Sequence, residues 1–125
     1  MNTRVTHFYD PETGTFTYVV NKFDSSLAIV IDPVLDYDPA SCEVKENSLA
    51  QVLEYVKENS LELVAVIETH AHADHLSSSQ SFKKYFPNLK VYISERIKLV
   101  QEKFKDIYEF EDFQCDGHQF DYLVK

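Results

Sequence analysis

A short apolar run, followed by a polar loop and a helix, constrains the fold of this chain more than any other stretch. Residues 63–67 (Leu-Val-Ala-Val-Ile) are rich in β-branched side chains, which is typical of a strand buried on both faces. Serines at 77–79 can cap a helix expected over Ser81–Phe86, and Pro87 would end it. Strand, loop and helix in this order predict an α/β domain with a parallel sheet.

The loop after this strand reads His70-Ala71-His72-Ala73-Asp74-His75. Imidazole and carboxylate are ligand types that zinc and iron accept. Polar residues at the carboxyl end of a parallel strand also lie where open α/β sheets place their ligands. We therefore predict a metal site here, in preference to a cluster of surface histidines at the start of a helix.

The rest of the chain predicts a hairpin, a third strand and two amphipathic helices. The alternation of apolar and polar residues over 5–9 and 15–21 predicts the hairpin, and 27–31 reads as the third strand. Apolar residues recur with helical spacing in two segments: Leu49, Val52, Leu53 and Val56, and then Ile97, Val100 and Phe104. The segment from 33 to 46 and the tail from 108 to 121 show no such period and are expected to be irregular.

Composition narrows the classes of function. A net charge of −9 disfavours nucleic acid and anionic membranes as partners, because their phosphates would repel the chain. Cys42 and Cys115 are far apart in sequence and no secretory leader is recognisable, so we expect a reducing, cytoplasmic setting. No run of about eighteen apolar residues occurs, and no transmembrane helix is expected.

The segment Glu68–Leu76 resembles the metal-binding signature of the metallo-β-lactamase superfamily. Its Glu-Thr-His-x-His-Ala-Asp-His form is similar to that of persulfide dioxygenases. Residues 31–39, 93–101 and 116–123 resemble the bacterial branch termed β-lactamase-like hydrolases. The resemblance implies an αβ/βα sandwich whose N-terminal half is residues 1–125, a single truncated domain with a mixed sheet and helices on one face.

The resemblance also assigns roles to residues. It implies four metal-binding residues in the loop: His70, His72, Asp74 and His75. In the mononuclear branch Asp74 and His75 correspond to a second metal position that stays empty. Asp32 is implied to support the loop without holding the metal, and Thr69 is expected to orient it by side-chain to backbone bonding. The family takes its remaining ligands from its second half, so the site is expected to be incomplete, and the implied metal is iron (Fe²⁺) or zinc.

Three functions follow from these expectations. By resemblance, a persulfide dioxygenase would bind glutathione persulfide at iron and oxidise it with O₂ to sulfite and glutathione. The alternative enzyme is a thioester hydrolase like glyoxalase II, in which the same motif holds two metals. The third function is that of a non-catalytic metal-binding half-domain, and we expect it to describe the isolated chain best.

The implied half-sandwich predicts a partner. One face of its sheet would be covered by helices, while the other would expose apolar side chains that soluble monomers rarely leave open. We expect a homodimer in which a second copy covers this face, with residues 27–31 and 63–67 at the centre of the interface.

Other conspicuous residues are expected to be structural. His7 reads as a half-exposed strand residue, and His118 lies where the family places no ligand. Glu68 is expected to be structural as well. The phenylalanines of the tail are expected to pack on the sheet edge rather than bind a ligand.

Overall fold

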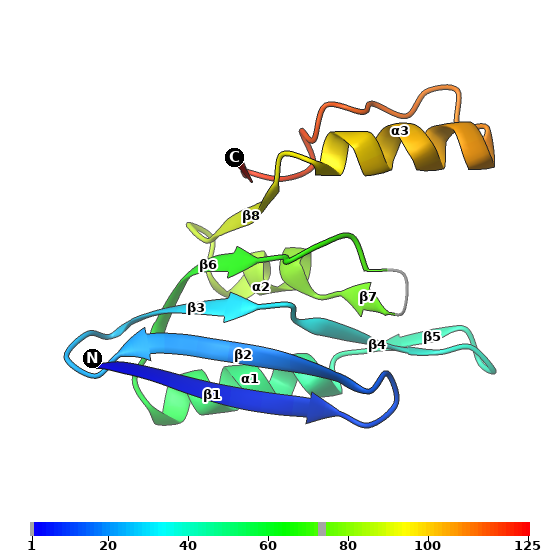
Figure 1. The fold of residues 1–125 in the computed structure, drawn as a ribbon. Coiled ribbons are helices and arrows are strands. Elements are labelled where there is room, and N and C mark those ends of the chain that lie inside the picture. The colour runs from blue at the N-terminus through cyan, green and yellow to red at the C-terminus, as the bar shows by residue number, and fades with distance from the viewer. Residues whose placement is uncertain (1, 73–74) are drawn as a thin grey trace.

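The computed structural model describes residues 2–72 and 75–125, and its centre is a six-stranded mixed sheet (Figure 1). In spatial order the strands are β1 (Thr3–Asp10), β2 (Thr15–Lys22), β3 (Leu27–Ile31), β6 (Glu62–Ile67), β8 (Lys90–Ser94) and β9 (Tyr122–Val124). The first three strands pair antiparallel, whereas β3, β6, β8 and β9 run parallel. The predicted hairpin, the third strand and the parallel strand before the histidine loop are confirmed.

A second, three-stranded sheet occupies part of the stretch that was predicted to be irregular. In it β4 (Val34–Asp38) pairs with both β5 (Glu43–Lys45) and β7 (Leu76–Ser77). The prediction of an irregular loop from 33 to 46 is therefore wrong. The prediction failed because one partner of β4 lies beyond the histidine loop, and a local sequence pattern does not indicate a pairing with a distant segment.

The described residues also form three helices: α1 (Asn47–Glu58), α2 (Ser79–Tyr85) and α3 (Ile97–Tyr108). Their positions agree with the predicted segments, but the start of α1 is capped in an unexpected way. The side chain before the helix makes no capping bond; instead Asp36 accepts hydrogen bonds from the Ser48 N–H at 2.8 Å and the Ser48 hydroxyl at 2.6 Å. The carboxylate also complements the positive end of the helix dipole. Strand β4 therefore fixes where α1 begins.

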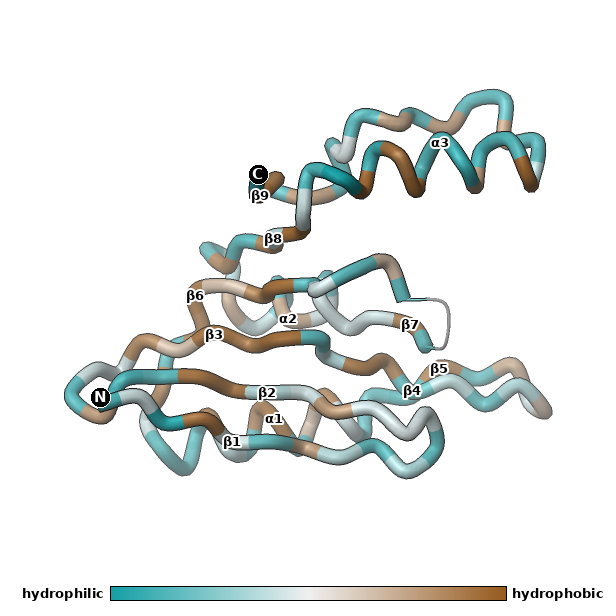
Figure 2. The backbone as a smooth tube through the Cα atoms, viewed as in Figure 1, coloured by the Kyte–Doolittle hydropathy of each residue, from teal (hydrophilic) through white to brown (hydrophobic). Residues whose placement is uncertain are grey.

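The core lies between one face of the large sheet and the helices α1 and α2, which lie on the same side of it (Figure 1). The strands supply much of the hydrophobic sequence, most visibly β2, β3 and β6 (Figure 2). The buried cluster comprises Val19, Ala28, Val30, Leu49, Val52, Val56, Leu63, Val66, Phe82, Leu89 and Val91. This packing confirms the predicted α/β class with helices on one face, and it holds the ends of β3 and β6 in fixed positions.

The opposite face of the sheet is apolar but carries neither α1 nor α2. Side chains of directly paired residues share a face, and on this side the pairs include Tyr9 with Phe16 and Tyr18 with Ile31. The aromatic rings of Tyr9, Phe16 and Tyr18 form a contiguous series, with centroids 5.1 and 6.2 Å apart. All three side chains are exposed. We call this surface the uncovered face.

The tail from 109 to 121 consists of turns and irregular backbone, as predicted, and it leads into β9. Phe120 packs against the core, as predicted for the phenylalanines of this segment. Phe110 and Phe113 differ from that prediction, since Phe110 stacks on Tyr108 at the end of α3 and Phe113 lies tilted against Phe110. Among the described residues, no helix is both long and apolar enough to cross a membrane.

Candidate metal centre

The site is built at the carboxyl ends of two adjacent parallel strands. Asp32 directly follows β3, and the histidine loop follows β6. Because Ile31 pairs with Ile67, both segments leave the sheet at the same level, and the Asp32 N–H donates to the Ile67 carbonyl at 3.0 Å. Polar side chains from distant parts of the sequence therefore meet at the position that open α/β sheets use for ligands.

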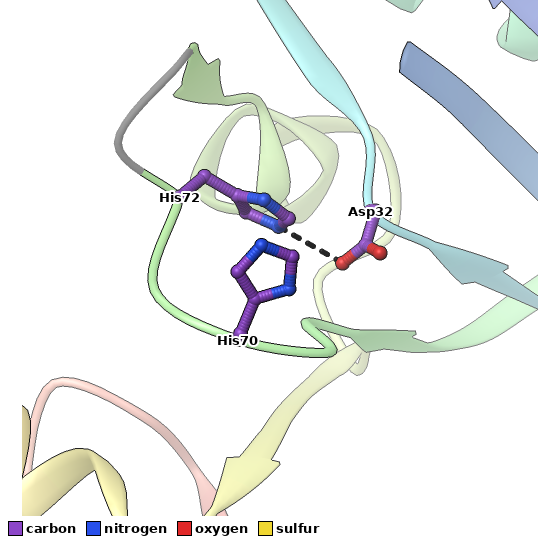
Figure 3. A group of neighbouring side chains, drawn as sticks. All are labelled: Asp32, His70 and His72. Atoms are coloured by element: carbon purple, nitrogen blue, oxygen red, sulfur yellow. Dashed lines mark hydrogen bonds and ion pairs between the residues drawn. The ribbon is translucent and has the colours of Figure 1, made fainter.

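Asp32 is the centre of the hydrogen-bond network. One carboxylate oxygen, Oδ1, accepts the Thr69 N–H at 2.8 Å and lies 2.9 Å from His72 Nε2. The other, Oδ2, accepts the Thr69 hydroxyl at 2.6 Å. The backbone of Asp32 has a φ of 51°, in the left-handed region. One carboxylate thus holds both the backbone and the side chain of Thr69 as well as the ring of His72; Figure 3 shows its bond to His72.

Thr69 determines where the proton of His70 lies. Its single hydroxyl proton is donated to Asp32, so the hydroxyl oxygen accepts the bond from His70 Nδ1 at 2.8 Å. His70 Nδ1 therefore carries the ring proton, and Nε2 keeps the lone pair that a metal ion requires. Thr69 had been expected to bond to the backbone, whereas its hydroxyl contacts two side chains.

His72 lies deeper in the protein than His70. Its side chain is 7% exposed, and its Nε2 lies 3.0 Å from Glu68 Oε2 as well as 2.9 Å from Asp32. Glu68 is buried and its other oxygen accepts a hydrogen bond from the Ser77 hydroxyl. Burial raises the pKa of the Glu68 carboxyl, while the Ser77 hydroxyl and His72 act in the opposite direction.

The third histidine of the motif lies beside the second. The rings of His72 and His75 stack with centroids 4.3 Å apart, and His75 Nδ1 lies 3.0 Å from the Leu76 carbonyl oxygen. The predicted ligand Asp74 lies outside the described residues. The structure therefore brings all three predicted histidines into one cluster.

Three of these side chains form a group that fits a metal ion. One oxygen of Asp32 and one ring nitrogen each of His70 and His72 all lie within 4.8 Å of one another (Figure 3). A carboxylate and two imidazoles are a donor set suited to zinc or non-haem iron. His70 is exposed, so an ion can reach the group from solvent.

Two cavities meet at this cluster. One, of about 460 Å³, lies between the β1–β2 turn, strand β4 and the histidines. The other, of about 380 Å³, includes Ile93, Ile97 and Phe120 in its wall. His72 and His75 line both cavities. Hollows with apolar walls and a few polar groups are typical of ligand sites.

The remaining histidines lie apart from the cluster. His7 is exposed on β1 with its ring against Phe16, and His118 bonds to Asp116 at 2.6 Å. Sequence reasoning missed the contact of Glu68 with His72. The available signal was an acidic residue at the end of a buried strand, four positions before a histidine.

The parallel strand pair with a histidine loop at its carboxyl end defines an α/β protein of the metal-binding type. A family model described as the Metallo-beta-lactamase superfamily matches residues 10–117, and the chain belongs to this superfamily. The family predicted from the motif is therefore confirmed. Members of this superfamily bind metal ions, which agrees with the donor group described above.

Curated relatives include a Glyoxylase B2 from Dictyostelium discoideum, 37% identical over 93% of this chain and 40% of that protein. Another is the mitochondrial persulfide dioxygenase ETHE1 of Homo sapiens, 31% identical over 69% of this chain and 30% of its own length. The crystal structure of ETHE1 from Myxococcus xanthus superposes with a TM-score of 0.59 at 28% identity, covering 71% of this chain and 34% of that one. The chain thus spans well under half the length of these relatives.

Proposed function

We propose that this chain is the metal-binding part of a persulfide dioxygenase-like domain. In this proposal His70 and His72 hold a divalent ion, and Asp74 and His75 belong to the neighbouring position. The meeting of His70 and His72 beside Asp32 carries the proposal, because one ring nitrogen of each histidine and one Asp32 oxygen lie within 4.8 Å of one another. The relationship to a persulfide dioxygenase favours iron, and zinc is the alternative.

Within the proposal Asp32 and Thr69 position the ligands. Asp32 already takes part in three hydrogen bonds, two from Thr69 and one with His72, which is the bonding expected of a residue that orients metal ligands. Thr69 in turn orients His70, because its hydroxyl oxygen is hydrogen-bonded to His70 Nδ1. Bound iron would supply redox chemistry at a centre with positions open for O₂ and a thiolate.

Metal affinity tests the site directly. The wild-type chain is expected to bind Zn²⁺ or Fe²⁺ more weakly than a complete site, and His70→Ala with His72→Ala is expected to abolish binding. Competition with a metal-chelating dye measures the affinity, and His7→Ala is the matched control because His7 lies on β1, away from the cluster. Binding is also expected to weaken on acidification, since protonated imidazole does not coordinate. Tight binding by the double variant would show that this loop does not hold the metal ion.

The proposed substrate is glutathione persulfide, oxidised with O₂ and water to sulfite and glutathione. A second candidate, hydrolysis of a glutathione thioester, is favoured by the Glyoxylase B2 relative. Oxygen uptake with the persulfide and thioester cleavage, each measured on iron-loaded and zinc-loaded protein, separate the two. The chain spans 40% or less of these relatives, so for the isolated 125 residues we expect neither activity above the free-metal background. Metal-dependent turnover would contradict this expectation and show that the 125 residues alone are sufficient for catalysis.

We propose in addition that a second copy of the chain covers the uncovered face. On β1, β2 and β3 this face presents uncharged side chains apart from Lys22 at the end of β2, so two copies of net charge −9 can meet there without placing carboxylates in contact. Ile29, Ile31, Ala65 and Ile67 lie at its centre by strand pairing. Light scattering is expected to show a dimer that Phe16→Lys with Tyr18→Lys converts to a monomer. A wild-type monomer that binds no hydrophobic dye would refute the proposal.

We also propose that residues 1–125 act as one domain and that the protein works in the cytoplasm. Cys42 and Cys115 are free thiols, which is consistent with a reducing compartment. Fluorescence microscopy of a tagged protein in its own cells tests the location. Exclusive recovery in an organelle fraction would contradict it.

A further inference from the structure

We infer that Glu68 is a positioning residue for His72: its carboxylate accepts a hydrogen bond from Nε2 of the ring, which leaves the lone pair available to a metal ion on Nδ1. This inference rests on the metal site proposed above. It assigns a role to a side chain that the sequence pattern alone marks as structural.

The geometry at Nε2 determines the tautomer of His72. Glu68 Oε2 lies 3.0 Å from this nitrogen and Asp32 Oδ1 lies 2.9 Å from it. Ionised carboxylates only accept hydrogen bonds, and a neutral imidazole has a single N–H. The ring nitrogen that faces two acceptors is therefore the protonated one, and the lone pair is on Nδ1.

Glu68 is itself held by two hydrogen bonds besides its contact with His72. Its N–H donates to the Tyr92 carbonyl of β8 at 2.9 Å, which fixes its backbone to the sheet. Its Oε1 accepts the Ser77 hydroxyl, and Ser77 Oγ in turn accepts the Ser79 N–H at 3.1 Å at the start of α2. The carboxylate thus connects His72 to β8, β7 and α2, and it limits rotation of the ring.

A purely structural role does not account for a carboxylate at this position. Glu68 is 4% exposed, and within the described residues its ion-pair partner is His72 rather than a lysine or arginine. A buried carboxylate without a basic partner destabilises a fold by several kcal/mol. An apolar or amide side chain would be more stable here, so the carboxylate is explained by what it does to His72.

Asp32 and Glu68 have separable effects. Asp32 contacts His72 directly and His70 through Thr69, whereas Glu68 contacts His72 and not His70. Loss of Glu68 should therefore disturb one ligand and leave the other in place. Changes of residues that orient metal ligands weaken binding by roughly 10- to 100-fold.

The test compares Glu68→Gln, Glu68→Leu and Glu62→Gln in the full chain. Glu62 is the first residue of β6, the strand that Glu68 directly follows, and it is exposed, so its variant is the matched control. Zn²⁺ affinity is measured by chelator competition, thermal stability on metal-free protein, and the His72 tautomer from imidazole ¹⁵N shifts at a pH where the ring is neutral. We expect Glu68→Gln to weaken binding roughly 10-fold and Glu68→Leu up to roughly 100-fold. We also expect unchanged or higher melting temperatures. In Glu68→Leu one of the two acceptors at Nε2 is lost and Asp32 remains, so we expect a smaller fraction of the Nε2–H tautomer than in the wild type.

Two results would overturn the inference. The first is Zn²⁺ affinity and a His72 tautomer like those of the wild type in both Glu68 variants. The second is a loss of affinity fully matched by a loss of metal-free stability, which would indicate a structural role. Failure of the metal site itself is distinguishable, since in that case His70→Ala with His72→Ala would also leave binding unchanged.

Discussion

The two faces of the six-stranded sheet use the same strands but bury different residues. On the covered face, Val19, Val30 and Val66 pack under α1 and α2 with no exposed surface. On the uncovered face, Tyr9 is 55% and Phe16 43% exposed. Strands that are apolar on both sides need a layer on each side. The comparison shows that α1 and α2 supply one layer, whereas the uncovered face has no such layer among the described residues, which is the reason for the second copy proposed above.

The largest expected effect is a core truncation on the covered face. Phe82 is fully buried on α2, so Phe82→Ala should lower the free energy of unfolding by about 3–5 kcal/mol. Phe16→Ala on the uncovered face should change it by less than about 1 kcal/mol at concentrations where the chain is monomeric. Urea denaturation of both variants measures the difference. Equal losses would show that the uncovered face is packed in the monomer.

A smaller effect is expected at the end of the covered face, where Gly117 lies against β9. Its φ is +72°, and an added Cβ would lie 2.9 Å from Leu123 Cδ1 and 3.4 Å from Ile97 Cγ2. Gly117→Ala should therefore destabilise the fold by about 1–3 kcal/mol, by overpacking and by backbone strain. Gly14→Ala is the matched control, because Gly14 has a similar φ of +70° with no atom near its Cβ. Thermal unfolding should show a larger loss for Gly117→Ala.

The smallest effect concerns an ion pair between Lys83 on α2 and Asp121, the residue directly before β9, whose carboxylate also accepts the Val91 N–H of β8. The hydrogen bond from Lys83, at 2.8 Å, and then the Val91 N–H lower the pKa of Asp121 below the ordinary value for aspartate. A lowered pKa in the folded state means that the stabilisation is present above the unfolded value and is lost as pH falls through the folded one. Asp121→Asn should cost about 1 kcal/mol at neutral pH, a modest value because the pair is partly exposed.

This prediction is tested by measuring how the destabilisation caused by Asp121→Asn depends on pH. The gap in unfolding free energy between wild type and Asp121→Asn should stay constant above about pH 5 and close as the carboxylate is protonated. Asp24→Asn, at an exposed turn, provides the comparison and should show no such gap. A gap that persists at low pH would mean that the Lys83 contact does not depend on charge.

Local sequence patterns correctly predicted the strands and helices whose formation depends on residues close together in the sequence. The apolar run at 63–67 and the helical spacing from Leu49 to Val56 lie in β6 and α1. The strand at 34–38 was missed because its partner Leu76–Ser77 is distant in sequence. The histidine loop was evident from residue type and spacing. The contact of Glu68 with His72 was not, since it depends on the rotation of a side chain at the end of a strand.

The backbone of Asp32 has a consequence for how this sequence can change. A non-glycine residue at a φ of 51° is less stable there than glycine by roughly 1 kcal/mol. Glycine at this position would relieve the strain and would also remove the carboxylate that orders Thr69 and His72. Selection of a random library for folding alone should therefore enrich Asp32→Gly, whereas selection for metal retention should exclude it. The two selections therefore favour different residues at this position. The residue that a homologue carries there indicates whether that homologue is selected for metal binding or for stability alone.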